Sequence, residues 1–232
     1  MHALVVDHVG EAIVSGRLTA GAVIEMSALE SELGASRSVV REAIRVLADK
    51  GLVYALPKRG TVVRDRESWS LLDPDLLRWQ YESRTDTPFL SNLAEVRAIV
   101  EPAAAALAAQ RRTDDDLAAM QRALEQMEDT EADAAAIVEA DVAFHGALLV
   151  ATHNDLLQRM ELVIQTALRA RDELVHGSAT VENSAQAHRD VLDAIVAEDP
   201  NAAHAAVESL LAVAVEDEAR IGARSEEEAV DS

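Results

Sequence analysis

The chain has 232 residues, enough for two domains, and 49% of them are hydrophobic while none is cysteine. No apolar run approaches the roughly 20 residues of a membrane-spanning helix, and the lack of cysteine excludes disulfides and thiolate chemistry. The N-terminus has neither the basic flank nor the cleavage site of a signal peptide, so we expect a cytoplasmic protein with no membrane partner.

The net charge of −21 is distributed unevenly along the chain. Residues 1–66 hold nine Lys and Arg against eight Asp and Glu, whereas the remainder holds 12 against 34. An acidic surface repels phosphates, so nucleic-acid binding is restricted to the N-terminal segment. The asymmetry also predicts a domain boundary near residue 66.

The first fifty residues carry the pattern of three helices. Apolar residues at helical spacing predict a helix over 3–15. Ser27, with Glu30 three residues later, predicts a capping box that opens a short helix over 27–34. An amphipathic third helix is expected over 36–51, with a tight turn before it.

A β-hairpin is expected directly after the third helix. Two short apolar runs, at 52–56 and 61–63, are separated by the sequence PKRG. Three helices and a hairpin make a winged helix-turn-helix, which we assign to residues 1–66. Residues 67–88 contain two prolines and both tryptophans, and we expect a linker there with a short helix over 74–82.

The chain from 89 to 224 is rich in alanine and has 3.6-residue periodicity, which predicts an all-α antiparallel helical bundle. No strand pattern follows residue 63, so we expect a mainly α protein. Residues 225–232 are expected to form a frayed tail. The six expected helices of the bundle begin near Phe89, Asp114, Asp133, Asp155, Glu182 and Pro200.

The third expected helix carries three arginines on one face. Arg37, Arg41 and Arg45 recur every four residues, roughly 90° around the helix from its apolar stripe. Such a helix suits the major groove, where arginines contact guanine edges or phosphates. The hydroxyls of Ser36 and Ser38, at the helix start, suit phosphates.

The tip of the expected hairpin is also basic. Lys58 and Arg59 lie beside the flexible Gly60, as in a wing that reaches an adjacent groove. The alternative interpretation is a solvated charged surface, with Arg45 paired to a neighbouring acid such as Glu42. The combination of capping box, glycine turn, basic helix and basic hairpin tip favours DNA binding.

These residues also carry a family resemblance. The run SGRLTAGAVIEMSALESELGASRSVVREAIRVLADKGLVYALPKRGTVV resembles the DNA-binding domain of the GntR family of bacterial transcription regulators. Members usually carry Pro at the positions of Ala20 and Val39, two departures away from the expected DNA contacts. The runs AEVRAIVEPAAAALAA, DVAFH and AHRDVLDAIVAED resemble the FCD domain of the FadR-like subfamily. The resemblance implies a homodimer that binds a palindromic operator, commonly as a repressor, and whose helical domain binds a metabolite.

A metal site is the second candidate. Asp141 and His145, four residues apart on an expected helix, can share a divalent ion, and His188 lies on a later helix. The resemblance implies that these three are among four ligands of zinc, nickel or manganese, which in turn coordinates a carboxylate effector. The fourth ligand position falls at Leu210, and His204, six residues earlier, points about 120° away. The alternative interpretation is a surface pair beside an ordinary buried histidine.

Arg97, on the first helix of the bundle, is a candidate partner for the effector carboxylate through its bidentate fork. It can equally pair with Glu101 one turn later. The expected effector is a sugar acid or another small carboxylate. Its binding would favour a dimer whose recognition helices no longer match grooves about 34 Å apart, and the segment LLDPDLLRWQ would carry that change.

Two other function classes remain as alternatives. A metal-assisted hydrolase would use the cluster of Asp141, His145 and His188, but no separate general base or phosphate-cradling loop accompanies it, and the basic head would have no purpose. A helical interaction protein whose head contacts protein would make Arg41 dispensable for operator binding. We therefore expect a DNA-binding regulator and not an enzyme.

Overall fold

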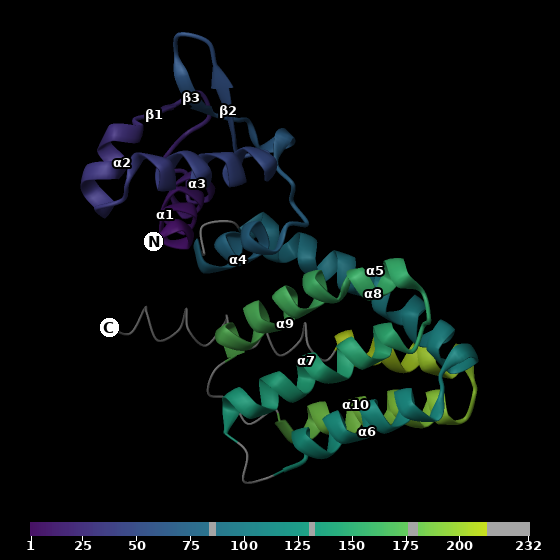
Figure 1. Ribbon diagram of the computed structural model, residues 1–232. Coiled ribbons are helices and arrows are strands. Elements are labelled where there is room, and N and C mark those ends of the chain that lie inside the picture. The colour runs from purple at the N-terminus through teal and green to yellow at the C-terminus, as the bar shows by residue number, and fades with distance from the viewer. Residues whose placement is uncertain (84–86, 130–132, 176–180, 213–232) are drawn as a thin grey trace, which may run out of the picture. The chain divides into compact units, whose positions relative to one another are not determined.

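The computed structural model describes residues 1–83, 87–129, 133–175 and 181–212 (Figure 1). The chain divides into two compact units, Met1–Phe89 and Leu90–Ser232, each of which is described by itself. No helix within the described ranges is long and apolar enough to cross a membrane. The tail expected at 225–232 lies outside the described residues.

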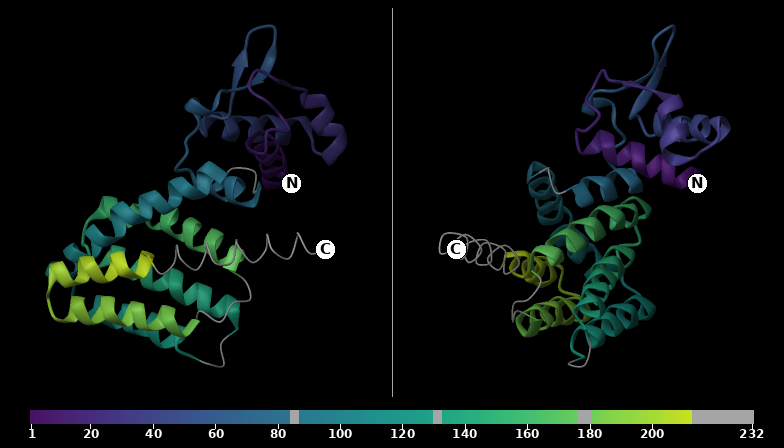
Figure 2. Two further views of the ribbon diagram at one scale, coloured as in Figure 1. Left: turned by 180° about the vertical axis from the view of Figure 1, so that it is seen from behind. Right: turned by 90° about the vertical axis from the view of Figure 1, so that its left-hand side faces the viewer.

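The first unit is a winged helix-turn-helix, with a hairpin that projects from it in both views of Figure 2. A short strand precedes the second helix and pairs with the hairpin, giving an antiparallel sheet of order β1-β3-β2. The sequence did not predict β1, because a strand of two residues is too short to show a period. The elements are α1 (His2–Val14), β1 (Val23–Ile24), α2 (Met26–Leu33), α3 (Arg37–Asp49), β2 (Val53–Leu56) and β3 (Gly60–Val63).

The predicted capping box on α2 is wrong. The helix begins at Met26 with Glu25 as its N-cap, and no side chain caps it. Ser27 therefore lies inside the first turn, where its carbonyl accepts a hydrogen bond from the Ser31 hydroxyl at 3.0 Å. Strand β1 ends immediately before Glu25, so the chain enters the helix earlier than the capping pattern indicates. The predicted end is confirmed, because Gly34 adopts the left-handed conformation with φ 62°.

Helix α3 packs against α1 and α2 through a fully buried stripe. Ser36 is its N-cap and accepts a hydrogen bond from the Val39 amide. The buried positions are Val40, Ala43 and Leu47. This stripe fixes which side of α3 faces outward.

A fourth helix belongs to the core of the first unit. Helix α4 (Pro74–Ser83) follows a short 3₁₀ turn at Arg66–Ser68 and packs on α1. The ring of Trp79 is completely buried and lies over Gly10, where an added Cβ would come within 2.4 Å of the ring. Only glycine allows so close an approach at this position.

Polar contacts hold the same helix in place. Trp79 Nε1 donates to Asp7 Oδ1 on α1 at 3.1 Å. Lys50, at the end of α3, lies 2.8 Å from carboxylate oxygens of both Asp73 and Asp75. Much of the segment expected as a linker over 67–88 is thus attached to the DNA-binding head.

The second unit is a bundle of helices. In its core, α7 packs against α6 and α9, and α6 also packs against α10. The described residues of this unit contain no strand, and the helix expected near Asp155 is divided in two at Met160. The elements are α5 (Thr87–Arg111), α6 (Asp114–Met127), α7 (Ala134–Val150), α8 (Asp155–Arg159), α9 (Glu161–Val175) and α10 (Val181–Val196), followed by helical residues 200–212.

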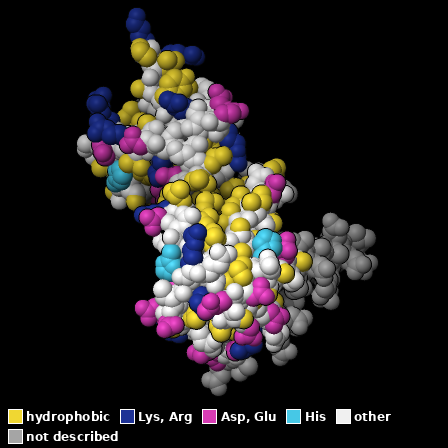
Figure 3. Space-filling model, turned by 90° about the vertical axis from the view of Figure 1, so that its right-hand side faces the viewer, with side chains coloured by type: hydrophobic (Ala, Val, Ile, Leu, Met, Phe, Trp, Pro, Cys, Tyr) yellow, Lys and Arg dark blue, Asp and Glu magenta, His cyan; other side chains and the backbone are white. Residues whose placement is uncertain are grey.

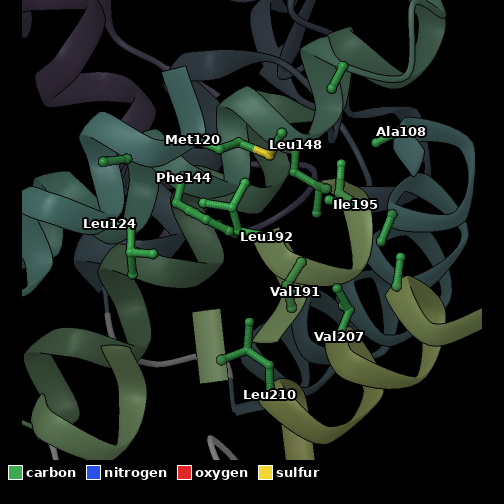
Figure 4. Close-up of a cluster of buried hydrophobic side chains, with 14 of the residues drawn as sticks. Ala108, Met120, Leu124, Phe144, Leu148, Val191, Leu192, Ile195, Val207 and Leu210 are labelled. Atoms are coloured by element: carbon green, nitrogen blue, oxygen red, sulfur yellow. The ribbon is translucent and has the colours of Figure 1, made fainter. Parts of the chain in front are cut away.

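Side chains from five segments fill the centre of this bundle: α5, α6, α7, α10 and the helical residues 200–212 (Figure 4). Phe144 and Leu148 of α7 meet Leu192 and Ile195 of α10, and all four are at most 4% exposed. Helix α6 begins with a capping box. The Thr113 hydroxyl accepts a hydrogen bond from the Asp116 amide, and the Asp116 carboxylate accepts one from the Thr113 amide. The packing gives α7 and α10 fixed neighbouring positions.

Candidate functional site

The outward face of α3 is basic. Arg37, Arg41 and Arg45 are exposed, on a different face of the helix from the stripe that packs against α1 and α2. Neither Arg37 nor Arg41 forms an ion pair within the described part of the chain. Ser36 and Ser38 are exposed at the start of the helix, with their hydroxyl oxygens 3.0 Å apart. The helix therefore presents free donors to an incoming ligand.

Arg45 differs from the other two arginines. Its Nη1 lies 3.5 Å from Glu42 Oε2, so the pairing that we considered as an alternative is present. Both side chains are well exposed, at 74% and 57%. Pairs of this kind contribute at most about 1 kcal/mol and exchange readily for other partners.

The hairpin tip is basic and exposed. Lys58 has φ 63° and Gly60 has φ 90°, so the turn between β2 and β3 uses left-handed backbone at both positions. Arg59 lies between them and, like Lys58, extends into solvent. Figure 3 shows Lys and Arg side chains gathered on the first unit, including its projecting tip.

A further exposed arginine near the wing escaped the sequence analysis. Arg64 directly follows β3, and its guanidinium lies 5.3 Å from the ring centroid of Tyr54 on β2. A stacked guanidinium keeps several donors free for a phosphate. The only sequence signal is a basic residue immediately after the second expected strand, at 61–63.

In the second unit, the structure brings together the three side chains expected to bind metal. Asp141 and His145 lie on α7, and His188 lies on α10. Asp141 Oδ1 is 2.9 Å from His188 Nε2 and 3.8 Å from His145 Nε2, and the two Nε2 atoms are 3.3 Å apart. Both imidazoles are buried, so the interpretation as a surface pair is wrong.

The donor set fits a divalent ion. Ligands at about 2.1 Å from a tetrahedral ion lie roughly 3.4 Å from one another, and the three separations here, from 2.9 to 3.8 Å, bracket that value. Two neutral imidazoles whose Nε2 atoms face each other share at most one proton. The buried Asp141 Oδ1 also lacks a well-aligned hydrogen bond. A cation would satisfy all three atoms.

A buried carboxylate connects this cluster to the candidate effector residue. Glu101, on α5, is completely buried, and its Oε1 accepts from Arg97 Nε at 2.6 Å. Its Oε2 lies 2.7 Å from Nδ1 of His145. The pairing of Arg97 with Glu101, left open by the sequence, is therefore present. The contact with His145 was missed because it joins two helices distant in sequence.

Both buried carboxylates are ionised at neutral pH. Burial would raise the pKa of Glu101, but the charges of His145 and Arg97 lower it to about 2. Burial would likewise raise the pKa of Asp141, but the hydrogen bond and charge of His188, with His145 and Arg97, hold it well below its usual range. The two carboxylates thus have positive partners in Arg97 and the imidazoles, and a bound cation would stabilise their charges in the same way.

No fourth protein ligand comes from the position expected for it. Leu210 is 6% exposed and packs with Val191 and Val207 in the apolar core (Figure 4). His204 faces Glu208 at 3.5 Å, with both side chains exposed, as expected for a histidine outside the site. Three protein ligands leave coordination positions for water or an effector.

Comparison with known proteins places both units in described families. Residues 3–63 match the bacterial regulatory proteins of the gntR family, and residues 92–213 match the FCD domain. The chain is 36% identical to the galactonate operon transcriptional repressor of Escherichia coli (strain K12), covering 90% of this chain and 92% of that protein. It is 32% identical to the HTH-type transcriptional regulator LutR of Bacillus subtilis (strain 168), covering 84% and 90%.

Solved structures agree with these matches. A Streptococcus agalactiae GntR structure is 26% identical, with a TM-score of 0.50 and coverage of 93% of this chain and 98% of that chain. The Lar regulator of the Listeria monocytogenes agr system shares the fold, with a TM-score of 0.66 at 21% identity and coverage of 95% and 97%. The chain is a transcription regulator, not an enzyme, and belongs to the GntR family, with a GntR DNA-binding domain followed by an FCD domain.

Proposed function

We propose that this regulator is a homodimeric repressor, acting in the cytoplasm, that releases a palindromic operator when a small carboxylate binds its FCD domain. The observation that carries the proposal is the exposed basic face of α3, where Arg37 and Arg41 have no ion-pair partner among the described residues. A rigid helix with free arginines is suited to the major groove. The family of operon regulators supports the same interpretation.

Each DNA contact has a distinct role in this proposal. Arg37 and Arg41 read guanine edges or phosphates, and Arg45 leaves Glu42 to join them. Ser36 and Ser38 bind phosphates at the helix start, which fixes the register of the helix on the duplex. Lys58, Arg59 and Gly60 place the wing in an adjacent groove.

The effector site lies at the buried cluster of the FCD domain. Asp141, His145 and His188 hold a divalent metal, either zinc, nickel or manganese, which when bound supplies a Lewis acid for the effector carboxylate. Arg97 is buried near the same cluster and provides additional positive charge for an anionic ligand. The name of the galactonate operon repressor supports a sugar acid as the effector.

The route from effector to DNA differs from the one expected from the sequence. The segment LLDPDLLRWQ was expected to carry the change between domains, but Trp79 within it is fully buried against Gly10 in the head. The helix that contains it therefore moves with the DNA-binding unit. We propose that the effector acts by changing the spacing of the two heads in the dimer, with α4 carried along as part of each head.

Release of DNA tests the proposal. Fluorescence anisotropy of a labelled duplex, selected for binding to the wild type, is followed while small carboxylates are added, beginning with galactonate. We expect one of them to dissociate the wild-type complex in the presence of zinc and to leave the His188→Ala complex intact. Equal dissociation of both complexes would show that the cluster is not the effector site.

A further inference from the structure

We infer that Glu101 is a positioning residue for the metal site, because it orients His145 so that Nε2 of the imidazole faces Asp141 and His188. The inference rests on the proposed metal site and adds a residue from a third helix, α5. None of the motifs in the sequence assigns Glu101 this role. The sequence indicated only that it could pair with Arg97 one turn away.

The contacts of Glu101 restrict its carboxylate to one orientation. Arg97 Nε lies 2.6 Å from Oε1, and a second guanidinium nitrogen lies 3.5 Å from Oε2. The remaining direction of Oε2 is toward His145 Nδ1, at 2.7 Å. Because Glu101 is completely buried, water cannot replace either partner. The carboxylate is therefore fixed by Arg97 and faces the back of the imidazole.

A carboxylate behind an imidazole determines which nitrogen binds a metal. Arg97 donates to both oxygens of Glu101, so the carboxylate faces His145 as an acceptor and favours the tautomer with the proton on Nδ1. That tautomer leaves a lone pair on Nε2, the atom 3.3 Å from His188 Nε2. The Nδ1 contact is short but is not aligned as a full hydrogen bond, so a small rotation of the ring is needed to complete it.

A purely structural role for Glu101 makes a different prediction. If Glu101 served only to neutralise the buried Arg97, removing both charges together would restore the site. If Glu101 positions His145, the site remains impaired without it, whatever stands at position 97. The double variant Arg97→Gln/Glu101→Gln separates these two roles.

Zinc affinity of the full chain, measured by competition with a chromophoric chelator, provides the first test. We expect Glu101→Gln and the double variant to bind zinc 10- to 100-fold more weakly than wild type, about the loss seen when a group supporting a metal ligand is removed. The control Glu125→Gln, an exposed carboxylate on α6, should bind as wild type does. Wild-type affinity in Glu101→Gln, or restored affinity in the double variant, would overturn the inference.

A second measurement is made on the wild type, with no change at Glu101 or Arg97. Nitrogen-15 NMR of histidine-labelled, metal-free wild type reports the tautomer of His145, assigned by comparison with His145→Asn. We expect the proton on Nδ1, and a proton on Nε2 would contradict the inference. If wild type binds no zinc, the proposed metal site and this inference both fail, whereas zinc binding that is unaffected in Glu101→Gln refutes the inference alone.

Discussion

The two units of the chain present their functional charges in opposite ways. In the head, Arg37 and Arg41 are exposed without ion-pair partners in the described chain, and the acid beside Arg45 is itself solvated. In the FCD unit, Glu101 and the two histidines are buried in mutual contact. A surface of free donors suits a large polyanion, which brings its own charge, whereas a compact buried cluster suits a small ion or ligand.

The two sites should also respond differently to the substitution of a side chain. An exposed arginine can be removed without disturbing the packing around it, so its loss is measured in binding. Removing a member of a buried cluster leaves partners unsatisfied and affects the site as a whole. Variants in each unit test this difference.

The largest effect is expected in α4, the helix that packs on α1 in the head. Trp79→Ala should lower the free energy of unfolding of the first unit by about 3–5 kcal/mol, because it empties a fully buried indole site. Both tryptophans of the chain, Trp69 and Trp79, lie in this unit, so the fluorescence of Trp69 reports its unfolding in urea. Leu72→Ala, at a residue 65% exposed, is the control. A loss no larger than that of the control would show that α4 is a free linker after all.

Next in size is the loss of a metal ligand. His188→Ala should weaken zinc binding by more than about 100-fold, the upper end for changes to groups that merely support a ligand. Competition with a chelator measures the affinity. His204→Ala, at an exposed histidine paired with Glu208, should bind zinc as wild type does. Equal losses in both variants would place the metal elsewhere.

Arg41→Ala should weaken operator binding by roughly 10- to 100-fold, as for the loss of one base or phosphate contact. The exposed position of Arg41 means that thermal unfolding should not change. Anisotropy at several salt concentrations measures the affinity, and loss of a phosphate contact lowers the salt slope by about 1. Arg122→Ala is the control: it removes the same charge from an exposed position on α6, in the other unit, and should leave the operator affinity unaltered.

The sequence predicted the head well because its site lies on single elements. The spacing of Arg37, Arg41 and Arg45 on one helix is a local property, and so is the basic hairpin tip. Strand β1 and the packing of Trp79 on Gly10 were not predictable locally, since each depends on a partner distant in sequence.

The buried site was predictable only in part. Asp141 and His145 share a helix face, so their spacing indicated a pair. His188 was added by family resemblance, and its approach to within 2.9 Å of Asp141 depends on how α7 and α10 pack. Glu101 had no local signal toward His145, because the contact arises where α5 meets α7.

The smallest effect is expected at the capping box of α6. Asp116→Asn should cost about 1 kcal/mol at neutral pH, because the carboxylate accepts from the backbone and hydroxyl of Thr113. Burial would raise the pKa of Asp116, but these hydrogen bonds and His153 lower it. The carboxylate therefore stabilises the fold above its unfolded pKa of about 3.9 and loses that contribution as the pH falls through the lower folded pKa.

Urea unfolding followed by circular dichroism at pH 7 and in acid measures this difference. We expect the gap between wild type and Asp116→Asn to shrink in acid. Asp115→Asn, at an exposed acid in the same first turn, should show a smaller gap at pH 7. A gap that grows in acid would contradict the assignment.

The most direct test of the DNA-binding account is a selection of bound duplexes from random DNA at low salt, made with full-length wild type and with Arg41→Ala. The account predicts that wild type enriches a palindrome whose half-sites lie about 34 Å apart, one turn of the duplex, and that Arg41→Ala loses this enrichment. Enrichment of no sequence by wild type, or of the same palindrome equally by both proteins, would contradict it.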